Sequence, residues 1–160
     1  MSMMIVNGEP VEIPAQERAQ IEAEWLANTT PTRADVDIER DRRLALPLTH
    51  SVRGQEYQFH VDEKSLRRVT AAAADAKFAI LKASLEDPPV DLLGNYRWQW
   101  PDLDFAWITV GGAPVLLDAH EVAALGDTFM NWEPALIYAA SAIKALDPIP
   151  ADYADDARWP

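Results

Sequence analysis

The side chains that could perform acid–base or metal chemistry are scattered along this sequence. His120 and Glu121 are adjacent, and Asp102 and Asp104 lie two residues apart. The first pair suggests metal binding or proton transfer, and the second suggests a glycosidase-like carboxylate pair or a calcium loop. Neither pair lies in a ligand-rich motif. We therefore interpret His120 as a surface residue at the start of a helix and the two aspartates as turn residues.

The motifs of common enzyme classes are missing from the sequence. There is no Gly-rich phosphate loop, no G-x-S-x-G and no H-E-x-x-H, and Gly111–Gly112 before Ala-Pro is typical of a turn. The acids Asp152, Asp155 and Asp156 lack the spacing and the closing glutamate of an EF-hand. Because the chain has no cysteine, disulfides, thiolate nucleophiles and sulfur-bound zinc are excluded. We expect a protein that is not an enzyme, with no metal site and no cofactor.

Tryptophan is the residue type that stands out, with six in 160 residues. Trp98, Trp100 and Trp107 are predicted on neighbouring strands, where they would form a stacking platform for a sugar or a protein partner. The alternative, which we favour, is that they fill the core between sheet and helix, because tryptophan buries a large area at little entropic cost. Trp25 and Trp159 lie outside the predicted core units, which makes them better candidates for contact residues.

The N-terminal part of the chain predicts an arm that needs a partner. Asn7–Gly8 between short apolar runs is typical of a tight hairpin turn. The following segment, Ala15 to Asn28, is rich in helix-forming residues. Its main apolar residues are Ile21, Trp25 and Leu26, too few to stabilise a short helix alone. We predict these three as partner-binding residues. The Thr-Thr-Pro-Thr sequence that follows indicates a linker.

Two hairpin–helix units are predicted in the rest of the chain. In the first, the alternating strand 55–61 leads to Asp62, which we place as the N-cap of an amphipathic helix. In the second, short strands lead to Asp118, and Glu121 three residues later completes a pattern like a capping box. The two units match over a short stretch at an offset of 56 residues. Pro134 is expected to kink or restart the second helix.

These elements predict an α+β protein with two β-hairpin–helix units that share one core, preceded by a helical N-terminal arm. We place the arm, a hairpin plus a short helix, at residues 1–32 and the α+β domain at residues 33–146. Residues 147–160 contain three prolines and four acids, which predicts an extended acidic tail.

Charge is distributed unevenly along the chain, whose formal net charge is −12. Residues 1–32 have five acids and one base, residues 33–85 have eight acids and ten bases, and residues 86–160 have thirteen acids and three bases. An acidic surface repels phosphate backbones, so we expect no nucleic-acid partner. No apolar run is long enough to span a bilayer, so we expect no membrane insertion.

Several motifs together share their pattern with a known family. They are the early arginines, the hairpin 55–61 before Asp62-x-x-Ser65, the alanine-rich helix, the segment Trp98-x-Trp100 to Trp107, and the stretches Val115–Val122 and Trp132–Lys144. On these motifs, Arg40 to Leu146 resembles a domain of unknown function found in phage and prophage tail-fibre-like and tail-assembly proteins. The Asp102–Asp104 segment departs from the Asp-Asn common in that family. The family has no assigned catalytic residue, so the resemblance implies none here.

The resemblance implies a non-enzymatic structural component of a bacteriophage tail, either a tail-fibre or a baseplate accessory protein, that docks through its N-terminal arm. The expected partners are other phage tail or fibre proteins and further copies of the same chain. The expected location is the virion tail, after synthesis in the cytoplasm of the bacterial host. One alternative is a tail-fibre assembly chaperone that is absent from the mature particle. Another is an envelope-carbohydrate hydrolase.

Overall fold

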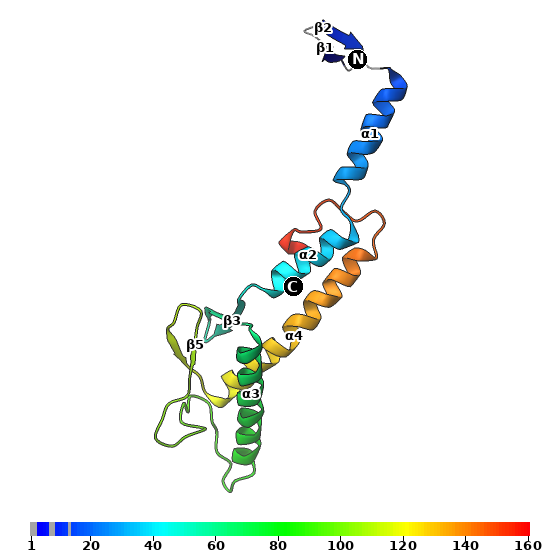
Figure 1. The fold of residues 1–160 in the computed structure, drawn as a ribbon. Helices are drawn as coiled ribbons and strands as arrows, with labels where there is room; N and C mark the ends of the chain where they lie inside the picture. Colours follow the sequence, from blue (N-terminus) through cyan, green and yellow to red (C-terminus); the bar gives the residue numbers. More distant parts are fainter. Residues whose placement is uncertain (1–2, 7–8, 13) are drawn as a thin grey trace.

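A computed structural model describes the backbone of residues 3–6, 9–12 and 14–160, and the side chains of residues 14–25 and 30–160. The fold is α+β, as predicted, with an N-terminal helix ahead of the main body (Figure 1). The elements in chain order are β1 (Met3–Val6), β2 (Glu9–Glu12), α1 (Ala15–Thr29), α2 (Arg33–Leu44), β3 (Leu48–Val52), β4 (Gln55–Phe59), α3 (Glu63–Ser84), β5 (Ala106–Ile108), β6 (Pro114–Leu116), α4 (Ala119–Lys144) and the 3-10 turn η1 (Asp156–Arg158).

The strands form three antiparallel hairpins, β1–β2, β3–β4 and β5–β6. The first is the predicted N-terminal hairpin, although its expected turn residues Asn7 and Gly8 lie outside the described residues. The second and third precede α3 and α4, as the two predicted units require. A backbone hydrogen bond 2.8 Å long joins the two units: Val110 N, just after β5, donates to the carbonyl of Gln58 in β4.

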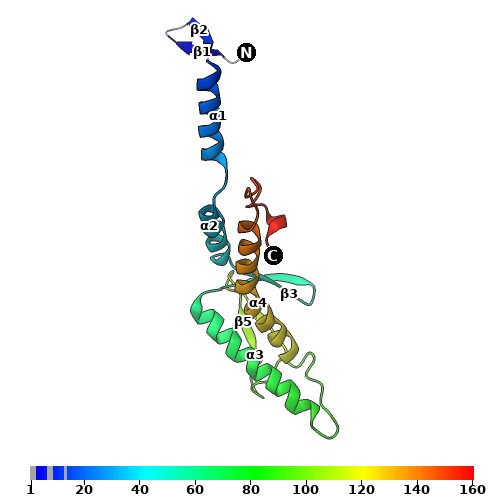
Figure 2. The same cartoon turned by 90° about the vertical axis from the view of Figure 1, so that its right-hand side faces the viewer.

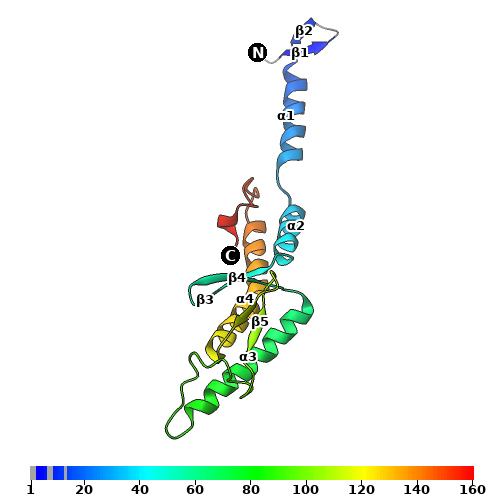
Figure 3. The same cartoon turned by 90° about the vertical axis from the view of Figure 1, so that its left-hand side faces the viewer.

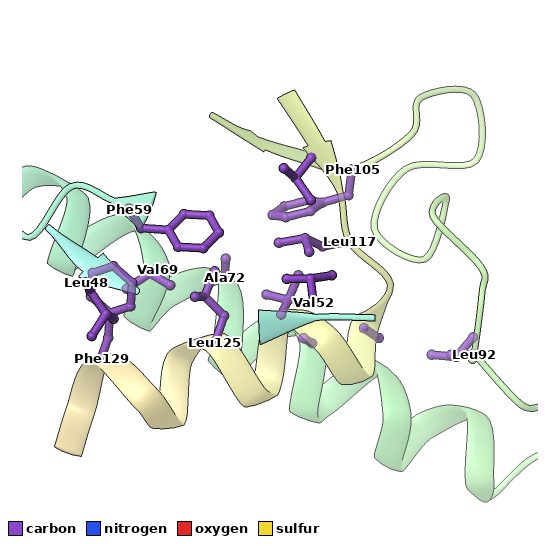
Figure 4. Packing of buried hydrophobic residues seen from close by; sticks show 14 of the residues in the cluster. Leu48, Val52, Phe59, Val69, Ala72, Leu92, Phe105, Leu117, Leu125 and Phe129 are labelled. Carbon is purple, nitrogen blue, oxygen red and sulfur yellow. The ribbon is translucent and has the colours of Figure 1, made fainter. Parts of the chain in front are cut away.

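Helix α4 is the element on which the body is assembled. Its first half packs along α3, and its second half packs along α2 (Figures 1 and 2). Figure 4 shows side chains from both hairpins lying over the α3–α4 pair, among them Val52, Phe59 and Leu117. These residues belong to one buried cluster, so the two hairpin–helix units share a core. A second cluster lies between α2, the end of α4 and the C-terminal segment, and Trp132 contacts both clusters.

Small residues allow α3 and α4 to approach closely. Ala72, Ala73 and Ala76 are buried on α3, and Gly126 is buried on α4. A Cβ atom added at Gly126 would collide with the Cβ of Ala73 and would lie 3.8 Å from the carbonyl oxygen of Val69. Glycine in a helix interior costs stability through backbone entropy. At this crossing glycine is nevertheless needed, because a side chain at position 126 would collide with α3.

Both predicted N-caps are present. Asp62 accepts a hydrogen bond from Ser65 N at 3.0 Å, and hydrogen bonds from the hydroxyl and amide of Ser65 hold the pKa of the Asp62 carboxyl below its usual value. Asp118 forms a full capping box with Glu121, in which each side chain accepts from the other residue's backbone N–H. Asp118 also accepts from Gly94 N at 2.8 Å, so this cap additionally fixes the loop before β5.

Two local expectations need correction. The segment before β5 that contains Trp98 and Trp100 forms turns, with an isolated bridge between Trp100 and Leu103 in place of a strand. Helix α4 runs without interruption from Ala119 to Lys144 through Pro134, so it does not restart there. The ring of Pro134 removes one backbone donor, but it lies on an exposed face where the unpaired carbonyl one turn earlier can bond to water.

The segment 147–160, for which we expected an extended acidic tail, folds back onto the body (Figures 2 and 3). Ile149 and Trp159 are buried in the second cluster, and the exposed fraction of Trp159 is only 7%. Its indole N–H donates to the carbonyl of Tyr153 at 2.8 Å. Trp159 is therefore a core residue, which corrects the expectation that it is a contact residue.

A buried arginine attaches this segment to α2. Arg43 donates to the Glu39 carboxylate at 2.7 Å, to the Asp156 carboxylate at 2.7 Å and to the Ala154 carbonyl at 2.9 Å. Its guanidinium lies over the Trp159 ring, 5.0 Å from the ring centroid. A hydrogen bond from Arg42, with Arg43 contributing, holds the pKa of Glu39 below its usual value. The buried charges are thus paired on several sides.

Replacing Gly126 by alanine should destabilise the protein by about 1–3 kcal/mol, because the added methyl group overpacks the α3–α4 crossing. In an open helix interior the same change would stabilise by about 1 kcal/mol. Urea unfolding followed by circular dichroism measures the difference. Ser141→Ala, at an exposed position of the same helix, is the matched control and should change stability by less than about 0.5 kcal/mol. Increased stability of Gly126→Ala would contradict the close crossing.

Replacing Trp159 by alanine should lower the free energy of unfolding by about 3 kcal/mol, because it empties the second cluster and removes the cover of Arg43. Deleting residues 147–160 should cost at least as much. Tyr138→Ala removes an exposed aromatic from α4 and serves as the control. Thermal and urea unfolding curves measure each variant. A truncated protein with wild-type stability would show that the segment is a dispensable tail.

Candidate functional site

Helix α1 extends away from the body in all three views (Figures 1, 2 and 3). Ile21 and Trp25 lie one turn apart on it, so they share a face. Their exposed fractions are 48% and 67%, so α1 presents two large apolar side chains to solvent. The third predicted partner-binding residue, Leu26, belongs to α1, but its side chain lies outside the described residues.

The three predicted platform tryptophans lie around one phenylalanine. Phe105 is buried, and the ring centroids of Trp98, Trp100 and Trp107 lie 5.1, 6.2 and 6.3 Å from its own. The Trp100 ring is nearly parallel to Phe105, with 20° between the planes, and the other two are tilted. The prediction missed Phe105, although its position two residues before Trp107 on an expected strand was a usable signal.

The tryptophans have different environments. Trp98 is partly buried against the main core, and its indole N–H donates to the Leu117 carbonyl at 3.2 Å. Trp107 also packs on the core. Trp100 has an exposed fraction of 48%. Trp98 and Trp107 therefore fill the core, the interpretation favoured from the sequence, whereas Trp100 is half exposed and its role in a stacking platform stays a prediction.

A hollow of about 500 Å³ opens beside this cluster, on the side facing α3. Trp100 and Trp107 line one wall, and Arg68 and Asp75 of α3 line the opposite wall. Apolar walls with a few polar groups are typical of ligand sites. The hollow is a candidate binding site that the sequence did not predict as a cavity, because α3 lies far from the tryptophans in the chain.

Two of the acidic residues that suggested enzyme chemistry, Asp104 and Glu121, have structural partners. Glu121 caps α4 and also accepts from Arg53 at 3.3 Å. Asp104 accepts from Arg97 at 2.8 Å, which closes the aromatic turn segment. His120 lies with its Nε2 atom 3.7 Å from Asp91, on the exposed start of α4. These contacts agree with the interpretation of His120 as a surface residue.

Within residues 3–6, 9–12 and 14–160, no group of three or more histidines or acids is arranged to hold a metal ion. None of the helices in that part of the chain is long and apolar enough to cross a membrane.

Alanine substitutions at Trp98 and Trp100 test whether the two side chains differ in how much they contribute to the core. Trp98→Ala should lower the free energy of unfolding by about 3 kcal/mol, because it removes a packed indole and leaves the Leu117 carbonyl without its donor. Trp100→Ala should cost less than about 1 kcal/mol, since half of that side chain is already in solvent. Urea unfolding of the two variants measures the difference. Equal losses would show that Trp100 is also a core residue.

Comparison with known proteins gives one family. No curated protein and no solved structure shows significant similarity to this chain. A family model described as "Domain of unknown function (DUF4376)" matches residues 27–158, which include α2, both body hairpins, α3, α4 and nearly all of the C-terminal segment. The hairpin β1–β2 and most of α1 lie outside the match. The chain belongs to the family of domains of unknown function DUF4376.

Proposed function

We propose that this protein is a non-enzymatic structural component of a bacteriophage tail, a tail-fibre or baseplate accessory protein, that docks through its N-terminal arm. The observation on which the proposal rests most is the exposed apolar face of α1, with Ile21 and Trp25 turned to solvent on a helix that projects from the body. The tail assignment itself comes from the resemblance of Arg40 to Leu146 to domains in phage tail proteins.

The arm has the properties of a docking element. An isolated helix of 15 residues is marginally stable in water, so α1 gains stability when its apolar face is covered. The body has two buried clusters of its own, formed by residues from Val36 onward, and none of the α1 side chains that the structure describes, residues 15–25, belongs to them. We therefore expect the surface that covers α1 to belong to another tail or fibre protein, with further copies of this chain bound alongside.

The contacts of the acidic residues favour a structural protein over a hydrolase. A glycosidase needs two carboxyl groups facing a shared substrate site. Here Asp104 is paired with Arg97, and Glu121 is held in the capping box of α4. Each carboxylate thus has a local structural task that accounts for its position.

The content of purified particles tests the proposed location. A tail component is expected in purified virions at a constant ratio to the other tail proteins, measured by quantitative mass spectrometry. An assembly chaperone binds during fibre folding and leaves, so it would occur in the lysate and be absent from particles. Absence from purified particles would therefore contradict the structural role and favour the chaperone alternative.

Deleting residues 1–32 should leave the body folded and abolish incorporation into particles, because the body retains its core and loses the docking face. Trp25→Ala should reduce incorporation in the same direction, as the loss of an aromatic anchor does. Tyr138→Ala, an exposed aromatic on the body, is the control and should incorporate normally. Circular dichroism checks folding, and blotting of purified particles measures incorporation. Normal incorporation of the truncated chain would place the docking surface on the body.

A further inference from the structure

A groove lies between α3 and the aromatic turn segment, and we call it the tryptophan groove. Its larger hollow, about 500 Å³, is lined by Trp100 and Trp107 opposite α3. A smaller hollow of about 280 Å³ adjoins it and is lined by Trp98, Phe78 and Lys82. Both hollows share Asp75 and Gln99. The two hollows adjoin where Gln99 donates to Asp75, and the name covers both.

One face of α3 forms the whole length of this groove. Its lining residues recur every three or four positions, so they share one helical face: Ser65, Arg68, Ala72, Asp75, Phe78 and Lys82. The stretch from Ser65 to Lys82 spans about 26 Å at the rise of an α-helix. The groove is thus long enough for an extended chain molecule and too open for a single buried cofactor.

Acceptor oxygens lie at the middle of the groove. Gln99 donates through Nε2 to the Asp75 carboxylate at 3.3 Å. The other amide atom, Oε1, is buried and has no hydrogen-bond partner within the part of the chain that the structure describes. Because that oxygen is buried, the acceptor that a ligand in the groove can reach is the exposed Asp75 carboxylate. Asp75 retains acceptor capacity beside its hydrogen bond to Gln99, so the site favours a ligand that brings donors.

Aromatic faces lie beside these acceptors. Trp100 is half exposed, and its ring is held in place by stacking on the buried Phe105. A fixed, accessible indole face next to hydrogen-bond acceptors suits a ligand with one apolar face and several hydroxyl donors. Pyranose rings have this chemistry, because their C–H groups form an apolar face and their hydroxyls lie around the edge.

Other ligand classes fit less well. Nucleic acid also stacks on tryptophan, and Arg68 and Lys82 line the groove, but the Asp75 carboxylate at its middle and the net charge of −12 oppose a phosphate backbone. A purely apolar peptide would cover the Asp75 carboxylate without donating to it. We propose that the tryptophan groove binds a neutral saccharide chain, which stacks on Trp100 and donates hydroxyl hydrogen bonds to Asp75. This site lies on the body and is independent of the docking role of the arm.

Titration of the full-length protein with soluble oligosaccharides tests the proposal. The probes are the tetramers of β-1,4-linked N-acetylglucosamine and α-1,4-linked glucose, with single-stranded oligothymidylate as a third probe. Binding is followed by intrinsic tryptophan fluorescence and by isothermal titration calorimetry. We expect at least one saccharide to bind and Trp100→Ala to weaken it by about tenfold or more. Asp75→Ala should weaken it in the same direction, and Tyr138→Ala should bind like the wild type.

Three outcomes would overturn the proposal. The first is that neither saccharide binds up to its solubility limit. The second is that saccharide binding persists unchanged in both Trp100→Ala and Asp75→Ala, which places the ligand elsewhere. The third is that oligothymidylate binds and the saccharides do not, which assigns the groove to another ligand class. Circular dichroism of each variant verifies that a lost signal does not come from unfolding. Incorporation of Trp100→Ala into particles separates this result from the role of the arm.

Discussion

The close contact between α3 and α4 is the constraint on which the rest of the structure depends. Gly126 lies against Ala73, and the side chain of any larger residue would separate the two helices. This spacing sets the width of the helical layer on which both hairpins lie. Phe59 from β4 and Leu117, directly after β6, are fully buried over it. One crossing of small residues thus joins two units that repeat the same local pattern.

The same crossing positions the aromatic segment. The long connection between α3 and β5 returns along α3, and Asp118 at the start of α4 holds it through Gly94. Trp98 is then fixed by the Leu117 carbonyl, and Phe105 packs between the tryptophans and the core. Because these anchors are all buried or hydrogen-bonded, Trp100 stands at a defined place beside α3 with about half of its side chain exposed. A rigid helix opposite a rigid aromatic wall is the origin of the tryptophan groove.

The two ends of the molecule differ in how well their apolar side chains are covered. At the end of α4, the C-terminal segment covers the second cluster, and Arg43 connects it to α2 through ion pairs and the Trp159 ring. That part of the surface is complete within the chain. On the other side of α2, α1 projects with Trp25 exposed. The contrast explains why the docking role is proposed for the arm.

The sequence by itself determined the elements whose causes are local. Asp62 and Asp118 cap the next helix through atoms three residues away, and the apolar stripe of each helix follows from spacing within one turn. Contacts between distant residues were decided only by the tertiary structure. The burial of Trp159 depends on Arg43, more than a hundred residues earlier, and the groove depends on α3 meeting Trp100. Contacts between such distant residues produce no periodic pattern in the sequence. The identity of a single tryptophan or arginine does not indicate whether it will be buried or exposed.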